Sequence, residues 1–246
     1  MAAVDHDNDG DTDLLVVNLA TQTDSFFRNN GTYFEDATVS VGLAAATKRY
    51  TRFGVALVDF NNDSRLDLYE ANGAIGFSRE TLNDQVYAEP DVLLRGLVDF
   101  RFKEVQFQGG TQTPLVYTSR GMAVGDVNND GGLDLLIVNR DGPANLLMNQ
   151  ISHQGNWIRF RVLDRHNRDA YAARVSADLG PIRVTRDVQP AGSYLASNDP
   201  RVHLGLGEAT SVNNVSVRWT DGTLEHFGDF KAGKTAVLRY SEGLAQ

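Results

Sequence analysis

Carboxylate and amide side chains recur at one fixed spacing in three short segments of the chain. The segments cover residues 5–13, 59–67 and 126–134, and each reads D-x-[DN]-x-D-x-x-x-D before an apolar stretch that ends in asparagine. Carboxylates crowded in this way repel one another unless they are protonated or a cation lies among them. At neutral pH the cation is the simpler answer, so the three loops predict three metal sites.

Oxygen ligands are expected from positions one, three, five and nine of each loop, together with the main-chain carbonyl of position seven. The residues are Asp5, Asp7, Asp9, Asp13 and the carbonyl of Asp11 in the first loop, Asp59, Asn61, Asp63, Asp67 and the carbonyl of Arg65 in the second, and Asp126, Asn128, Asp130, Asp134 and the carbonyl of Gly132 in the third. Calcium takes about six to eight oxygen ligands, whereas magnesium demands stricter octahedral geometry. The pattern therefore favours up to three Ca²⁺ ions, with water completing each shell.

Position six separates the second loop from the other two. Gly10 and Gly131 hold this position in the first and third loops, where glycine suits a backbone bend with positive φ, but the second loop has Ser64. A residue with a side chain costs about 1 kcal/mol in a left-handed conformation. We therefore expect the second site to be the weakest, or empty, and a titration in which it binds most tightly would contradict this.

Two other interpretations of the loops are weaker. An EF-hand needs glutamate at position twelve and flanking helices, but the residues there are Val16, Glu70 and Ile137, and the flanks are β-prone. Only the second loop fits, and that loop lacks the glycine. A single Asp-rich turn is usually only solvated, but three copies with the same spacing favour a bound metal.

The repeat also predicts a fold. The loops start at residues 5, 59 and 126, a spacing that suits propeller blades of four short strands with insertions. β-prone runs at 53–58 and 121–125 enter the second and third loops, and residues 26–34 read as strand, Asn-Gly turn and strand. Residues 1–150 are therefore expected to form a partial β-propeller of about three blades. Asp5 follows Met1 so closely that we expect the first repeat to lack its leading strand.

The pattern changes after residue 150. No acidic loop follows, apolar and polar residues alternate at 157–162 and 215–219, Asp221-Gly222 signals a hairpin, and 236–240 reads as a closing strand. Residues 151–246 are expected to form a second, smaller, β-sandwich-like domain. The fold class is therefore all-β.

Composition and short motifs narrow the function. The chain of 246 residues has no cysteine, which excludes disulfides and thiolate metal sites, and its net charge of −9 argues against nucleic acid as a partner. No apolar run is long enough to span a membrane. The five histidines share no metal-ligand spacing, and neither a nucleophile elbow nor a phosphate-binding loop occurs. No catalytic or organic cofactor-binding residue is predicted.

The two regions resemble known families. Residues 1–150 resemble the FG-GAP/VCBS repeats of integrin α-subunit propellers through the three loops, Phe53-Gly54 and Gly121-Met122. The second region resembles the ASPIC/UnbV domain through the segments 167–169, 173–175, 186–188, 192–195, 198–207 and 217–222. The order of the two is similar to that of the cartilage acidic protein 1 family, although the EGF-like module of its animal members is absent.

The resemblance implies a calcium-binding, non-enzymatic binding or adhesion protein with a protein or glycan ligand. Its place would be extracellular, periplasmic or at the cell surface, with a signal peptide and further blades upstream of this chain. A hydrolase or lyase on a propeller scaffold and a structural spacer are the alternatives. Asp199, Arg201, Tyr194 and His203 form the densest polar cluster of the second region, either as a hydrogen-bonded turn or as a ligand surface.

Overall fold

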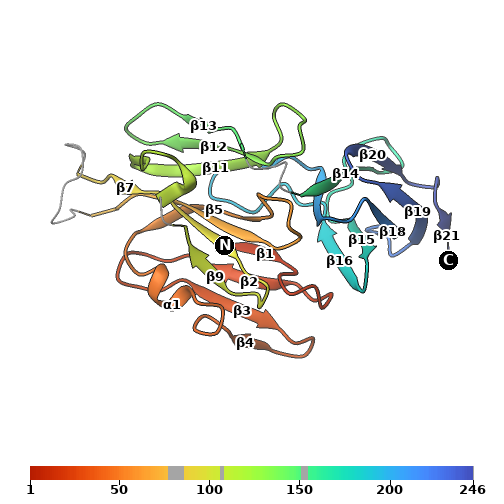
Figure 1. Cartoon of the computed structure of the whole chain (residues 1–246), viewed down its shortest axis with the longest axis horizontal. Helices are drawn as coiled ribbons and strands as arrows, with labels where there is room; N and C mark the ends of the chain where they lie inside the picture. The colour runs from red at the N-terminus through yellow and green to blue at the C-terminus, as the bar shows by residue number, and fades with distance from the viewer. Residues whose placement is uncertain (77–85, 106–107, 151–154, 246) are drawn as a thin grey trace.

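The computed structural model describes residues 1–76, 86–105, 108–150 and 155–245, and nearly all of the regular secondary structure in this part is β-strand (Figure 1). Its one α-helix is the single turn α1 (Leu43–Ala46), and Gln108–Gly110 form a 3₁₀ turn. Five sheets have three or more strands, and β7 (Glu89–Pro90) pairs with β10 (Val116–Tyr117) in a sixth. The all-β prediction is therefore confirmed.

Three sheets follow one another along the first part of the chain as antiparallel meanders. The first contains β1 (Ala2–Val4), β2 (Asp13–Val16), β3 (Ser25–Asn29) and β4 (Phe34–Asp36); the second contains β5 (Arg52–Val58), β6 (Asp67–Asn72), β8 (Val92–Gly96) and β9 (Phe102–Glu104); the third contains β11 (Ser119–Gly125), β12 (Asp134–Asn139) and β13 (Asn145–Leu147). In each sheet an acidic loop joins the first strand to the second.

The sheets pack face to face in a propeller-like row. Leu15 of the first sheet shares a core with Val55 and Leu68 of the second. Tyr69, which follows the second loop as Leu15 follows the first, lies in a separate core with residues of the third sheet, among them Ile137. Successive side chains of a strand point to opposite faces of its sheet, so the second sheet can contact both of its neighbours. This packing fixes the three loops at corresponding places in the row.

The leading strand of the first repeat is present, and the expectation that it is missing was wrong. Ala2–Val4 pair with β2 in the register Ala2↔Leu15 and Val4↔Asp13. Val58↔Asp67 and Gly125↔Asp134 are the equivalent pairs at the other two loops.

Residues 156–245 add two further sheets, which we call the C-terminal sheets. One has the order β17 (Val202–Gly207), β14 (Asn156–Leu163) and β20 (Lys234–Arg239); the other has the order β16 (Ile182–Asp187), β15 (Arg174–Leu179), β18 (Ser211–Arg218), β19 (Leu224–Lys231) and β21 (Leu244–Ala245). Ile158 and Val217 lie in one core that both sheets share. The described part thus has five sheets of three or more strands, where about three blades and a sandwich-like domain were expected; no acidic loop marks the last two sheets in the sequence.

The asparagine that ends each repeat stabilises the opposite end of the sheets. The side chain of Asn72 donates to the carbonyl oxygen of Pro90 at 2.9 Å, and its main-chain N–H donates to Asp91 Oδ1 at 2.8 Å. Asn18 makes the same two bonds, to Thr23 and Asp24. These asparagines therefore bond to the main chain and to an aspartate of the segment that leads to the next strand of the sheet.

Asp91 gives a test of this buried end. Burial raises the pKa of Asp91 to about 7, against the opposing effect of the Asn72 N–H. Between about pH 4 and 7 the folded protein therefore holds a proton that the unfolded chain has lost, so its stability falls as pH rises. We expect Asp91→Asn to remove this contribution and to gain on the order of 2 kcal/mol over the wild type between pH 5 and pH 8. Urea unfolding at both pH values measures it, with the exposed Asp99→Asn as control; equal pH profiles would contradict it.

Candidate metal centre

The three acidic loops have the same hydrogen-bond pattern. In each, the aspartate at position one accepts the main-chain N–H of position six, and the aspartate at position nine accepts the N–H of position two. The distances for Asp5, Asp59 and Asp126 are 3.1, 2.7 and 2.7 Å, and those for Asp13, Asp67 and Asp134 are 3.0, 3.1 and 2.8 Å. The repeated letters of the sequence thus correspond to one repeated structure.

Two further contacts are repeated. The second oxygen of the position-nine aspartate accepts an N–H at or just beyond the end of the third strand, from Asn29, Gly96 and Asn149, each at 2.8 Å. The aspartate at position five accepts the N–H of position seven in every loop. This last bond holds Asp11, Arg65 and Gly132, whose main-chain carbonyls are predicted ligands, close to the aspartate at position five. Each loop is therefore fixed both internally and to its own sheet.

Positions four and six adopt left-handed backbone conformations in all three loops. Position four is asparagine each time, with φ of 58°, 58° and 59° at Asn8, Asn62 and Asn129. Asparagine tolerates this region better than most residues, so the repeated asparagine is a sequence signal that the nine-residue pattern left out. At position six φ is 97° at Gly10, 93° at Gly131 and 71° at Ser64. Ser64 thus has the left-handed backbone conformation on which the expected energetic cost at this position depends.

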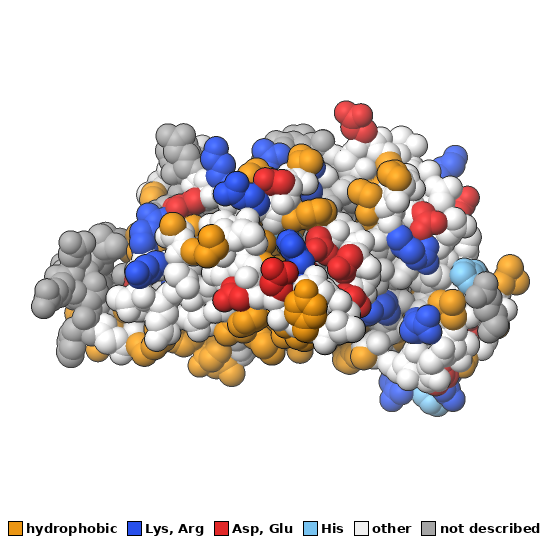
Figure 2. All heavy atoms as spheres, turned by 90° about the horizontal axis from the view of Figure 1, so that it is seen from below, with side chains coloured by type: hydrophobic (Ala, Val, Ile, Leu, Met, Phe, Trp, Pro, Cys, Tyr) orange, Lys and Arg blue, Asp and Glu red, His pale blue; other side chains and the backbone are white. Residues whose placement is uncertain are grey.

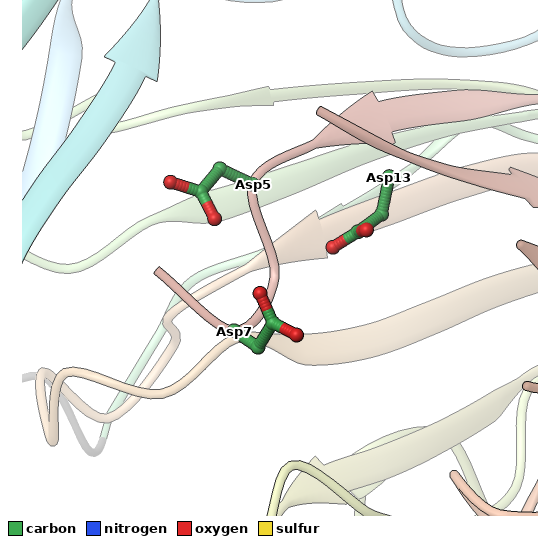
Figure 3. Close-up of side chains that lie close together, drawn as sticks. All are labelled: Asp5, Asp7 and Asp13. Carbon is green, nitrogen blue, oxygen red and sulfur yellow. The ribbon is translucent and has the colours of Figure 1, made fainter. Parts of the chain in front are cut away.

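The first loop gathers three carboxylates. Asp5, Asp7 and Asp13 each offer an oxygen within 4.8 Å of the others (Figure 3). Among the described residues, no other set of three or more acids, histidines or cysteines brings its ligand atoms this close together. Asp5 Oδ1 and Asp7 Oδ1 are buried and have no hydrogen-bond partner. Asp9 lies outside this group, at an exposed position. Buried anionic oxygens without donors are suited to a hard cation such as calcium.

Burial makes these carboxylates costly to ionise. It raises the pKa of Asp5 to about 6, with Arg186 opposing and Asp9 and Asp7 adding to the rise. The pKa values of Asp7 and Asp13 are raised for the same first reason, burial. A divalent cation would reverse this effect, because it favours the charged form of every carboxylate around it.

The second loop is the most buried of the three. Asp59, Asn61 and Asp67 are all buried, and Asn61 Oδ1 has no hydrogen-bond partner. Burial, followed by the charges of Asp67 and Asp63, raises the pKa of Asp59 to about 7. Asp63 lies further out and forms ion pairs with Arg65 and, at 3.2 Å, with Arg95. Asn61 Oδ1 is therefore the buried oxygen of this loop that is left without a donor.

The third loop is more open on its outer side. Asp126 and Asp134 are buried, whereas Asn128 and Asp130 are exposed and bonded to each other, with Asn128 Nδ2 donating to Asp130 Oδ2 at 2.8 Å. Asp126 also forms a buried ion pair with Arg159 of β14. None of the side-chain oxygens predicted as ligands here is buried without a partner among the described residues.

The C-terminal sheets contact all three loops, which sequence reasoning missed. At the first loop, Arg186 donates to the carbonyl of Asp5 at 3.0 Å and to Asn8 Oδ1 at 3.2 Å. At the second, a ring nitrogen of His203 lies 2.7 Å from Asn62 Oδ1, and the N–H of Gly207 donates to the carbonyl of Asn62 at 2.7 Å. The position-four asparagines are therefore also docking points.

The third loop is contacted by the polar cluster noted in the sequence. Arg201 pairs with Asp199 and donates to Asn129 Oδ1 at 2.7 Å, while the ring of Tyr194 packs edge-on against Phe53 at 5.1 Å. The cluster therefore ties the C-terminal sheets to the first region. Figure 1 shows the C-terminal sheets to the right of the three stacked sheets, and Figure 2 shows acidic and basic side chains close together near the middle of one face.

Comparison with protein families agrees with this architecture. The FG-GAP-like repeat model matches residues 5–70, and the ASPIC and UnbV model matches residues 163–245. A search of the curated proteins found no match. Among the described residues, no helix has the length and apolar character needed to cross a membrane. The chain therefore contains one segment that matches an FG-GAP-like repeat and another that matches an ASPIC and UnbV domain.

Proposed function

We propose that the chain is a calcium-binding, non-enzymatic protein that is exported or extracellular and serves binding or adhesion, in the manner of the cartilage acidic protein 1 family. The observation that carries the proposal is the identical construction of the three loops, with buried oxygens left free in the first two. Its ligand would be a protein or a glycan. In this proposal residues 1–150 are the propeller region and residues 151–246 a small sandwich-like domain.

The chemistry of the loops fits calcium. Asp5 Oδ1, Asp7 Oδ1 and Asn61 Oδ1 are buried oxygens without a donor, and oxygen is the ligand type that calcium takes. The residues that would hold the ions are those at positions one, three, five and nine of each loop, with the carbonyl at position seven. A bound ion would supply the positive charge that these desolvated carboxylates lack.

Calcium would also stabilise the fold. Each loop joins the first two strands of its sheet and contacts the C-terminal sheets, so an ion that fixes a loop fixes both neighbours. A ligand that binds the folded state alone raises its stability in proportion to the logarithm of ligand concentration over Kd. Part of the folding free energy of this chain is therefore expected to depend on the metal.

A thermal melt tests the proposal. We expect chelation with EDTA to lower the unfolding midpoint by about 5 °C or more relative to millimolar calcium, because ligand linkage of a few kcal/mol shifts Tm by that much in a chain of this size. Magnesium at equal concentration is the control and should restore less of the midpoint. Metal analysis of the purified chain completes the test: a protein without bound calcium, whose midpoint ignores both calcium and EDTA, would refute the proposal.

A further inference from the structure

We propose that Arg159 of the C-terminal sheets acts as the built-in positive charge of the third loop, and that this makes the third loop the weakest calcium site of the three. The inference rests on the proposed calcium function. It differs from the ranking expected from Ser64, which placed the second loop last. Among the described residues, Arg159 is the arginine that forms a buried ion pair with a predicted ligand carboxylate. Arg186, beside the first loop, bonds to the carbonyl oxygen of Asp5 and to Asn8 Oδ1 instead.

Arg159 is buried together with the carboxylate that it neutralises. Its side chain is 1% exposed, that of Asp126 is 0% exposed, and the two form an ion pair through Arg159 Nη2 and Asp126 Oδ2. Nε and Nη1 of Arg159 have no hydrogen-bond partner among the described residues. Asp126 is therefore the main compensation for this buried charge, and separating the two would leave a buried ion unpaired, which is strongly unfavourable.

Packing prevents Arg159 from moving aside. Its guanidinium lies over the ring of Trp157, 5.0 Å from the centroid, and Trp157 in turn stacks on His203 at 6.2 Å with an interplanar angle of 18°. Trp157 also covers the third loop, since a Cβ added to Gly131 would lie 1.9 Å from its indole nitrogen. His203 is hydrogen-bonded to Asn62 of the second loop. The guanidinium is thus held by side chains that are themselves fixed.

The carboxylates of the first two loops form ion pairs with arginines that are partly exposed, whereas Arg186 bonds to a carbonyl and an amide oxygen of the first loop. Arg28 pairs with Asp7 at 3.1 Å and is 31% exposed, and Arg95 pairs with Asp63 at 3.2 Å and is 55% exposed. When Ca²⁺ binds, an exposed arginine side chain can rotate away from the carboxylate toward the solvent at little cost, because surface ion pairs contribute little to stability. The first two loops also keep buried oxygens without a partner on Asp5, Asp7 and Asn61, whereas no buried side-chain oxygen of the third loop lacks a partner among the described residues.

The strain at Ser64 is partly offset. Its Oγ donates to the carbonyl of Gly205 at 3.0 Å, so the side chain that makes the left-handed backbone unfavourable also makes a contact with the C-terminal sheets. In the third loop, by contrast, the fixed positive charge of Arg159 would repel an entering Ca²⁺ and is already paired with Asp126. Electrostatics therefore outweighs backbone strain in setting the order of the sites.

Calcium titration of the full chain tests this, with isothermal calorimetry as the readout. We expect two tight sites and one weak site in the wild type. Arg159→Met removes the charge and keeps much of the volume, and should tighten the weak site at least tenfold. Arg159→Lys keeps the charge and should leave that site weak. Arg161→Met, an exposed position two residues along the same strand, is the matched control and should change nothing.

The weak site is assigned independently by loop variants of the wild type. Asp130→Asn in the third loop should abolish the weak site, and Asp63→Asn in the second should abolish a tight one. These two variants decide the matter even if Arg159→Met does not fold. Three equally tight sites, an unchanged weak site in Arg159→Met, or loss of a tight site in Asp130→Asn would each overturn the inference. A chain that binds no calcium refutes the proposed function itself.

Discussion

Replacing Asp5 by asparagine is expected to remove one tightly bound calcium ion from the protein. The two oxygens of Asp5 have different tasks: Oδ2 accepts the N–H of Gly10, while Oδ1 is buried without a donor. An amide has only one acceptor oxygen, so asparagine can keep the loop closed or offer a ligand, but not both. We expect the affinity of the first loop to fall by about a hundredfold, or about 2.7 kcal/mol. Calorimetric titration measures it as the loss of one equivalent.

Asp11 provides the control for this change. It is predicted to contribute its carbonyl oxygen, so Asp11→Asn removes one negative charge from the same loop and keeps the ligand. Its calcium stoichiometry should equal that of the wild type. If both variants lost the ion equally, general charge rather than specific ligation would explain binding, and the ligand assignment would be wrong.

The second large effect is expected from Gly205→Ala. A Cβ at this position would lie 2.0 Å from Asp59 Oδ2 and 2.7 Å from the Cα of Asn62, so the strand β17 and the second loop could not keep their present distance. Because backbone atoms cannot move aside as a side chain can, we expect the free energy of unfolding to fall by about 2–3 kcal/mol, the cost of severe overpacking. Urea unfolding at fixed calcium concentration measures the loss.

Gly192→Ala is the matched control for this substitution. The nearest atom to an added Cβ there is Asn198 Nδ2 at 3.6 Å, an ordinary contact distance. Its stability should stay close to that of the wild type. Equal stability of Gly205→Ala and the wild type would show that the C-terminal sheets do not rest on the second loop in solution.

The loops could be predicted from the sequence because their construction is local. Nine consecutive residues contain most of the donors and acceptors of each loop, so a pattern of letters is enough to place Asp59, Asp67 and the residues between them. The hairpin turns were predictable for the same reason: Gly31 and Gly222 both have positive φ between paired strands, as the Asn-Gly and Asp-Gly pairs indicate.

The docking of the C-terminal sheets was not predictable in this way. Arg159 contacts Asp126, Arg186 contacts Asp5, and His203 contacts Asn62 across long sequence separations. No residue near them in the sequence indicates which partner each one has. Arginine and histidine on alternating strands look like ordinary solvent-facing residues. Their burial depends on how five sheets pack, which no local pattern encodes.

The pairing of β14 with β20 has a consequence for the time order of folding. The two strands lie parallel and in register from Ile158↔Lys234 to Leu163↔Arg239, although one opens and the other nearly closes the last region of the chain. Contacts between such distant segments form slowly, because a long loop must close first. During synthesis the row of three sheets would emerge from the ribosome well before β20 does. The acidic loops would then meet ions in the surrounding solvent before the C-terminal sheets close over them.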